Sequence, residues 1–171
     1  MSETETNLLA AFAGESQARN KYIFYAKMAR KEGLHYIADI FSETARHEEQ
    51  HAKNLYNLFD GIGDTASNLR QAIAGEEYEA NTMYPEFAET AQKEGHKEAA
   101  FLFKQLAKVE AHHRDCFQHL LNKLENNTLF TRETAITWKC IKCGWVTEAT
   151  EPPEQCPACK HSTNYFEPSD I

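Results

Sequence analysis

The chain of 171 residues carries 18 Lys and Arg against 26 Asp and Glu, a net charge of −8 that argues against a nucleic-acid partner, which would need a basic surface. Its N-terminus, MSETETN, is polar and no long apolar run follows, so we expect no signal peptide, no membrane span and a cytoplasmic location. In that compartment five cysteines are expected to be metal ligands or thiols rather than disulfides.

Composition divides the chain into a long helical domain, a linker and a small module. Residues 1–127 are rich in Ala, Glu, Lys, Leu and Phe and contain a single proline, Pro85. Residues 137–171 contain four cysteines, both tryptophans and the other four prolines. We therefore predict a mostly helical domain over 1–127, a linker over 128–136 and a metal-binding β module over 137–171.

The long domain contains an internal repeat. AGES at 13–16 matches AGEE at 74–77 with an offset of 61, and KMARKEG at 27–33 matches ETAQKEG at 89–95 with an offset of 62. The sequence thus contains two copies of one helical hairpin, and the second copy has one extra residue. A helix absorbs an extra residue as a π-bulge or a register shift, often at a functional site.

Hydrophobic periodicity predicts four helices, over 7–31, 35–59, 69–94 and 97–126, with Gly33 and Gly95 at the hairpin turns. In every helix, acidic residues occupy the apolar seam that a four-helix bundle would bury. They are Glu15, Glu48, Glu76, Glu79 and Glu110, and two of them begin Glu-x-x-His motifs, with His51 and His113.

A charged surface is the ordinary explanation of Glu-rich helices, and a single Glu-x-x-His motif is weak support for a metal site. Here, however, five carboxylates share the seam, and burying even one unpaired carboxylate costs several kcal/mol. Two divalent cations would supply the missing charge. A neutral cluster of protonated carboxyl groups is the alternative, but it leaves the histidines unexplained. Carboxylate and imidazole ligands together suit iron, manganese or zinc.

One Glu from each of two helices, with Glu-x-x-His from each of the other two, is the ligand pattern of ferritin-like di-iron bundles. The repeat relates Glu48 to Glu110, so we expect these two to bridge the metals. Glu15 and Glu76 would be terminal ligands, with one histidine on each metal. Glu79 is a surplus carboxylate, because its counterpart in the first copy is Ala18.

The C-terminal module has the cysteine spacing of a tetrahedral sulfur site. CIKCGW at 140–145 and CPACK at 156–160 give C-x2-C-x12-C-x2-C, with Cys140, Cys143, Cys156 and Cys159 as ligands. Gly144 permits the positive-φ turn such a loop requires. A module this small depends on its metal, with Trp138, Trp145, Tyr165 and Phe166 expected to pack around it. Iron would make it an electron carrier and zinc a structural ribbon, and the spacing fits both.

The fifth cysteine, Cys116, follows His113 by three residues in the last predicted helix. We expect it to be a small buried apolar residue, which is the commoner role of a free cysteine.

The chain contains GESQARNKY, the two Glu-x-x-His motifs, GEEYEANTMYPEFA and the final CxxCG…CPxC. Together these motifs resemble rubrerythrins over nearly the whole chain. The resemblance implies a ferritin-like four-helix bundle with a non-haem di-iron site, fused to a rubredoxin-like module with one iron. It implies reduction of hydrogen peroxide, with electrons that originate from NAD(P)H and arrive through a redox donor protein, a rubredoxin or a reductase. Zinc or manganese can replace iron in a preparation.

Carried over residue by residue, the resemblance implies a further set of site residues. Tyr22 and Tyr84 match tyrosines that line the family's di-iron pocket. Lys160 departs from the pattern, because rubredoxins usually have glycine there. The implied di-iron ligands are Glu15, Glu48, His51, Glu76, Glu79, Glu110 and His113, and the implied ligands of the single iron are Cys140, Cys143, Cys156 and Cys159.

Two other functions share parts of this pattern. A ferroxidase or iron-storage protein would use the same bundle, although it has no need of an electron-entry module. A non-enzymatic bundle with a structural zinc ribbon would act as an interaction module. Whichever function applies, the connection over residues 61–68 is short. We therefore expect a homodimer whose subunits exchange helical hairpins.

Overall fold

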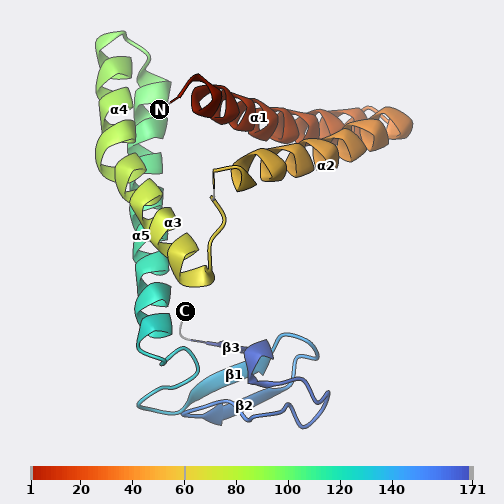
Figure 1. Ribbon diagram of the computed structural model, residues 1–171, viewed down its shortest axis with the longest axis vertical. Helices are drawn as coiled ribbons and strands as arrows, with labels where there is room; N and C mark the ends of the chain where they lie inside the picture. The colour runs from red at the N-terminus through yellow and green to blue at the C-terminus, as the bar shows by residue number, and fades with distance from the viewer. Residues whose placement is uncertain (1, 60, 170–171) are drawn as a thin grey trace. The chain divides into compact units, whose positions relative to one another are not determined.

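The computed structural model describes residues 2–59 and 61–169, and it is mostly helical with a small C-terminal module of three strands (Figure 1). The chain divides into two compact units, residues 1–63 and residues 64–171. Within the described part, no helix is both long enough and apolar enough to cross a membrane.

The first unit is a hairpin of α1 (Glu3–Lys31) and α2 (His35–Asn57). Helix α1 begins four residues before the predicted start because Ser2 and Glu5 form a capping box. Gly33 has a φ of +79° and makes the turn between the helices, as predicted. The buried residues of the hairpin are alanines, whose small side chains let two helices approach closely: Ala26, Ala29, Ala38, Ala45 and Ala52.

Replacing Gly33 with alanine should destabilise the first hairpin, because a left-handed backbone costs an alanine about 1–2 kcal/mol. Gly33→Asn is the matched control, since asparagine tolerates positive φ better than alanine does. Chemical denaturation should rank the unfolding free energies as wild type, then Gly33→Asn, then Gly33→Ala. Equal values for the two variants would show that the turn does not constrain φ.

The second unit contains the other hairpin, made of one broken helix and one continuous helix. The broken helix consists of α3 (Thr65–Tyr78), a π-helical turn η1 (Glu79–Met83) and α4 (Tyr84–Lys93), and α5 (Lys97–Glu125) packs beside it. The π turn confirms the extra residue inferred from the change of repeat offset. The predicted start at residue 69 is wrong, because the Asp64 side chain caps the helix by accepting a hydrogen bond from the Ser67 backbone N–H at 2.8 Å.

The cap at Asp64 should make stability depend on acid pH. The hydrogen bond from the Ser67 backbone N–H lowers the pKa of Asp64 below its ordinary value of 3.8. Its contribution is therefore complete above pH 3.8 and is lost as the pH falls through the lower folded value. Asp64→Asn keeps a cap that does not titrate, so the stability advantage of wild type over this variant should shrink on acidification. An advantage that stays constant across that range would contradict the cap.

Each hairpin, taken alone, leaves large apolar side chains exposed. Phe24 is 60% exposed and Leu58 69% in the first hairpin, and Phe101 is 67% exposed in the second. Two packed helices have no interior of their own, so they bury only the narrow line of small residues between them. The four-helix core that periodicity predicts therefore requires another hairpin over each open face.

The C-terminal module is a three-stranded antiparallel sheet in the order β2-β1-β3, with β1 (Ile136–Cys140), β2 (Val146–Ala149) and β3 (Phe166–Pro168). A short 3-10 turn (Thr163–Tyr165) precedes β3. The core of the C-terminal module comprises Trp138, Cys140, Cys156 and Phe166.

Residues 128–136, predicted as a linker, are ordered against this module. Phe130 packs on the Trp138 ring at 6.4 Å, and the Arg132 guanidinium lies 5.2 Å from the same ring. Arg132 also donates hydrogen bonds to the backbone carbonyls of Thr128 and Thr131.

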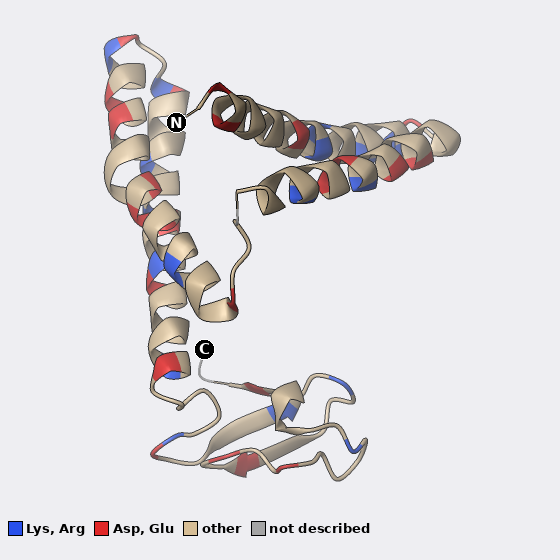
Figure 2. Ribbon diagram, in the orientation of Figure 1, with Lys and Arg blue, Asp and Glu red and all other residues tan. Residues whose placement is uncertain are grey.

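Acidic and basic positions are mixed along the helices of both hairpins (Figure 2).

Candidate metal centres

The first hairpin brings together a group of two carboxylates and one imidazole. Glu15 comes from α1, and Glu48 and His51 come from adjacent turns of α2. Nδ1 of His51 lies 2.8 Å from Oε2 of Glu48 and 3.8 Å from Oε2 of Glu15. One ligand atom from each residue lies within 4.8 Å of the others, which is close enough for all three to hold one cation.

The second hairpin repeats this arrangement. Nδ1 of His113 lies 2.7 Å from Oε2 of Glu110 and 3.8 Å from Oε2 of Glu76, with Glu76 on α3 and the other two on α5. Burial, and then the Glu110 carboxylate, raise the pKa of Glu76 above its ordinary value. Negative charge is thus unfavourable at this site, and a bound cation would reverse that effect. The donor set fits a carboxylate-ligated metal such as iron.

Glu79 and Tyr84 lie beside the second group without belonging to it. Glu79 is the first residue of the π turn, and its charge contributes to the raised pKa of Glu76. Burial, and then the charges of Glu79 and Glu110, raise the pKa of Tyr84. Tyr84 therefore keeps its phenolic proton and can donate a hydrogen bond near these carboxylates.

An aromatic cluster supports the tyrosine in each hairpin. Tyr22 packs against Tyr25 and Phe41, with ring centroids 6.3 and 6.1 Å apart. At the positions 62 residues later, Tyr84 packs against Phe87 and Phe103 at 6.5 and 6.0 Å. The family motifs include the tyrosines but not their aromatic partners, although the repeat relates all three positions.

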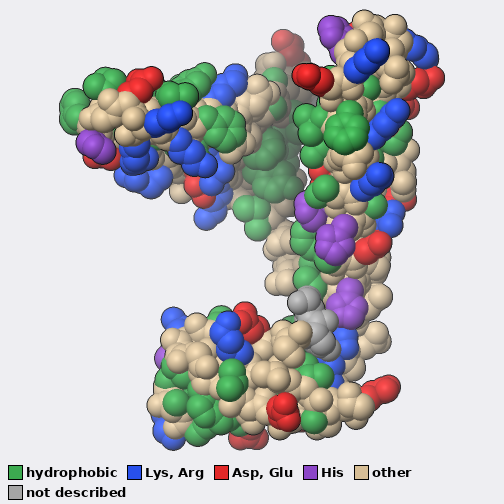
Figure 3. Space-filling model, turned by 180° about the vertical axis from the view of Figure 1, so that it is seen from behind, with side chains coloured by type: hydrophobic (Ala, Val, Ile, Leu, Met, Phe, Trp, Pro, Cys, Tyr) green, Lys and Arg blue, Asp and Glu red, His purple; other side chains and the backbone are tan. Residues whose placement is uncertain are grey.

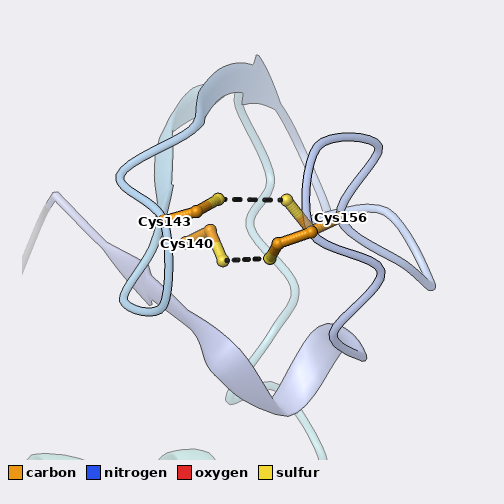
Figure 4. Close-up of side chains that lie close together, drawn as sticks. Cys140, Cys143 and Cys156 are labelled. Carbon is orange, nitrogen blue, oxygen red and sulfur yellow. Dashed lines mark hydrogen bonds between the residues drawn. The ribbon is translucent and has the colours of Figure 1, made fainter.

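The four cysteines of the module converge as their spacing predicts. Figure 4 shows sulfur atoms from the two loops facing one another, and Sγ of Cys140 lies 3.6 Å from Sγ of Cys159, as does Sγ of Cys143 from Sγ of Cys156. The four ligand atoms lie within 4.8 Å of one another, so they fit a single tetrahedral metal.

The thiols of this cluster do not ionise alike. Burial opposes ionisation of Cys156, but hydrogen bonds from the backbone N–H groups of Cys159 and Ala158 outweigh it and lower the pKa of Cys156 to about 7. For Cys143, the Trp145 backbone N–H favours the thiolate, but burial and the neighbouring thiols raise its pKa to about 12. Sulfur atoms this close share protons, and a metal that binds all four displaces those protons.

Both cysteine loops close with the same backbone turn. The Gly144 N–H donates to the Cys140 carbonyl at 2.8 Å, and the Lys160 N–H donates to the Cys156 carbonyl at 2.9 Å. Gly144 has a φ of +77°, as predicted, and Lys160 has a φ of +64°. A lysine thus occupies a conformation that favours glycine.

Lys160→Gly should therefore raise the unfolding free energy of the metal-loaded module by about 0.5–1 kcal/mol, because relief of the left-handed backbone exceeds the added flexibility of glycine. Gly144→Ala, the matched change in the other loop, should lower it by about 1 kcal/mol. Trp138 and Trp145 are the chain's two tryptophans, so tryptophan fluorescence during denaturation reports on this module. A destabilised Lys160→Gly variant would contradict the strain.

Two expectations about individual side chains are corrected. Cys116 is half-buried rather than buried, and its Sγ lies 3.6 Å from Nε2 of His112. Tyr165 lies outside the module's core, where it packs edge-on against the His161 ring at 4.7 Å. The expected packing of Trp138, Trp145 and Phe166 is confirmed.

Comparison of the sequence with known proteins identifies the family to which the chain belongs. Residues 6–121 match the model of the rubrerythrin family, and residues 138–167 match that of the rubrerythrin rubredoxin-like domain. The chain belongs to the rubrerythrin family. Rubrerythrin of Porphyromonas gingivalis is 47% identical over 98% of this chain and 90% of its own length.

Rubrerythrin of Nitratidesulfovibrio vulgaris is 42% identical over 97% of this chain and 94% of its own. A solved structure of nigerythrin in a partially reduced state is 29% identical over 98% of this chain and 87% of its own, with a TM-score of 0.38. As a rubrerythrin-family protein, the chain combines a di-iron carboxylate domain with a rubredoxin-like four-cysteine iron domain.

Proposed function

We propose that this chain reduces hydrogen peroxide to water at its di-iron centre, with electrons delivered through the four-cysteine iron. The observation that carries the proposal is the presence in one chain of two matching carboxylate–histidine groups and a four-thiolate module. An iron-storage protein would need the first feature only. We assign Glu15, Glu48, His51, Glu76, Glu79, Glu110 and His113 as di-iron ligands, and Cys140, Cys143, Cys156 and Cys159 as ligands of the single iron.

The reaction consumes two electrons and two protons for each peroxide and forms two water molecules. When bound, a pair of ferrous ions supplies both electrons together. The chain's own residues hold the metals, pass protons through their carboxylates and donate hydrogen bonds to the substrate. Tyr84 suits the last role, because its raised pKa keeps the O–H intact near Glu79 and Glu110, and the rings of Phe87 and Phe103 hold it in position.

The four-cysteine module would return electrons to the di-iron centre one at a time. Cys143 is exposed, so this edge of the module is accessible to a redox partner. We propose that the partner is a rubredoxin or a reductase whose electrons originate from NAD(P)H. Free thiols that bind metal require reducing conditions, so the cytoplasm remains the predicted location.

Cys143→Ser tests this route of electron entry. The variant should still allow peroxide to oxidise the ferrous di-iron centre in a single turnover, but steady-state turnover with the donor protein should fall to background. Ser162→Ala, an exposed serine of the same module, is the matched control and should retain turnover. Survival of turnover in a Cys143→Ser protein that lacks the sulfur-bound iron would exclude the module as the entry point, and loss of single-turnover oxidation in wild type would exclude the peroxidase itself.

We also propose that the protein is a homodimer in which each di-iron centre combines the first hairpin of one subunit with the second hairpin of the other. The support lies in the short connection after α2. Gly61 donates its N–H to the Tyr56 carbonyl at 3.2 Å, and Phe59 donates to the same carbonyl at 3.1 Å. These two hydrogen bonds hold Phe59 and Gly61 close to the end of α2, which shortens the reach of the connection.

In a ferritin-like bundle α2 and α3 run parallel, so the connection between them must travel back along the bundle. Within one chain, that connection would need a longer reach. His51 lies six residues before the end of α2 at Asn57, and Glu76 lies eleven residues after Thr65, so matching their heights requires about 26 Å along the axis. A lateral step of about 10 Å between helices adds to this. The eight steps from Asn57 to Thr65 span at most about 29 Å when fully extended, and the hydrogen bonds of Phe59 and Gly61 to the Tyr56 carbonyl prevent that extension.

Complementation between two inactive chains tests the exchange of hairpins. Glu48→Ala and Glu110→Ala proteins should each be inactive alone, because each lacks one ligand in every site. Refolded together, a hairpin-exchanged dimer has one intact site and one doubly damaged site, so about half the wild-type activity per mixed dimer should return. A mixed dimer that stays inactive would show that each chain builds its own site.

A further inference from the structure

Three side chains that can bind a metal follow one another along α5, outside the di-iron ligands. They are His112, Cys116 and His119, spaced four and three residues apart, and all lie on the helix Lys97–Glu125. At about 100° per residue they fall within about 60° of one another around the helix axis. Nε2 of His112 already lies 3.6 Å from Sγ of Cys116, and the His119 ring would have to turn toward this pair to complete a group of three ligands. Figure 3 shows histidine side chains gathered along the lower half of this hairpin.

The internal repeat supplies a comparison for these positions. Subtracting the offset of 62 gives Gln50, Asn54 and Asn57 on α2, where Gln50 Nε2 donates to Asn54 Oδ1 at 2.7 Å. The same contact between residues four apart is therefore made in both hairpins. In α2 it joins two neutral amides, which are poor ligands for a transition metal. In α5 all three positions carry imidazole or thiol groups instead.

This stripe faces a different side of α5 from the proposed di-iron ligands, although the ring centroid of His112 lies 6.5 Å from that of His113. Glu110 and His113 lie on the apolar seam of α5, and the stripe is centred about 110° from that seam. His112 and His119 are exposed and Cys116 is half-buried, so solvent reaches the group within its unit.

We propose that His112, Cys116 and His119 form a binding site for a borderline divalent cation of the zinc class, with water as the fourth ligand. Residues four apart on a helix chelate zinc through one face, as the two histidines of a His-x-x-x-His pair do. Thiolate with imidazole is a donor set that favours zinc over calcium or magnesium. Binding converts the Cys116 thiol to a thiolate and releases its proton to solvent.

Equilibrium dialysis of the iron-loaded, full-length protein against micromolar zinc tests the site. We expect one zinc per chain with no loss of iron. The variant that copies the α2 stripe into α5, His112→Gln/Cys116→Asn/His119→Asn, should lose this zinc and keep its iron. His47→Gln, which changes an exposed histidine of α2, is the control and should bind zinc as wild type does.

Alkylation of Cys116 gives a second readout that does not depend on activity. Zinc at ten times its dissociation constant leaves about a tenth of the sites free, so iodoacetamide should modify Cys116 about tenfold more slowly, and a chelator should restore the rate. Absence of the additional zinc, zinc that persists in the triple variant, or an unchanged alkylation rate would each overturn the proposal. A His119→Asn variant with wild-type affinity would overturn the three-ligand site.

Discussion

The gathering of carboxylates beside a histidine in each hairpin is the constraint on which the proposed centre depends. Each hairpin presents two glutamates and one histidine within reach of a single cation. Burial raises the pKa of Glu76, so negative charge there is already unfavourable before any second hairpin covers it. In the proposed assembly, a bound metal would offset the charge of these carboxylates and favour closure of the bundle, which would tie assembly of the core to formation of the centre.

The repeat explains why the two carboxylate–histidine groups match so closely. Distances from the histidine to its two glutamates are 2.8 and 3.8 Å in one hairpin and 2.7 and 3.8 Å in the other. The hairpins differ where the second copy contains its π turn, which introduces Glu79 opposite Ala18 of the first. The extra residue therefore gives the second hairpin one carboxylate more than the first, and π turns are frequent at functional sites.

Much of this organisation could be predicted from the sequence, because repeats and metal-ligand spacings are local patterns. The change of offset predicted a π-bulge or a register shift, and the structure has the π turn. Gly33 and Gly95 were predicted as hairpin turns and Gly144 as a positive-φ turn, and all three have positive φ. What was missed depends on contacts between residues. The cap at Asp64 places the start of α3 four residues before the predicted one. The contact of Cys116 with His112 depends on the helical backbone of α5, which brings residues four apart together. Periodicity showed which face of each hairpin is apolar, but it does not say which hairpin covers that face.

Low-temperature Mössbauer spectroscopy of the iron-loaded, oxidised protein tests the central claim most directly, because it distinguishes paired from isolated ferric ions. If the two carboxylate–histidine groups combine into one centre, the carboxylate-bound iron should appear as a spin-coupled, diamagnetic pair beside the signal of the sulfur-bound iron. If each hairpin instead binds its own isolated iron, two uncoupled paramagnetic ferric signals will appear, and the account of a shared centre is wrong.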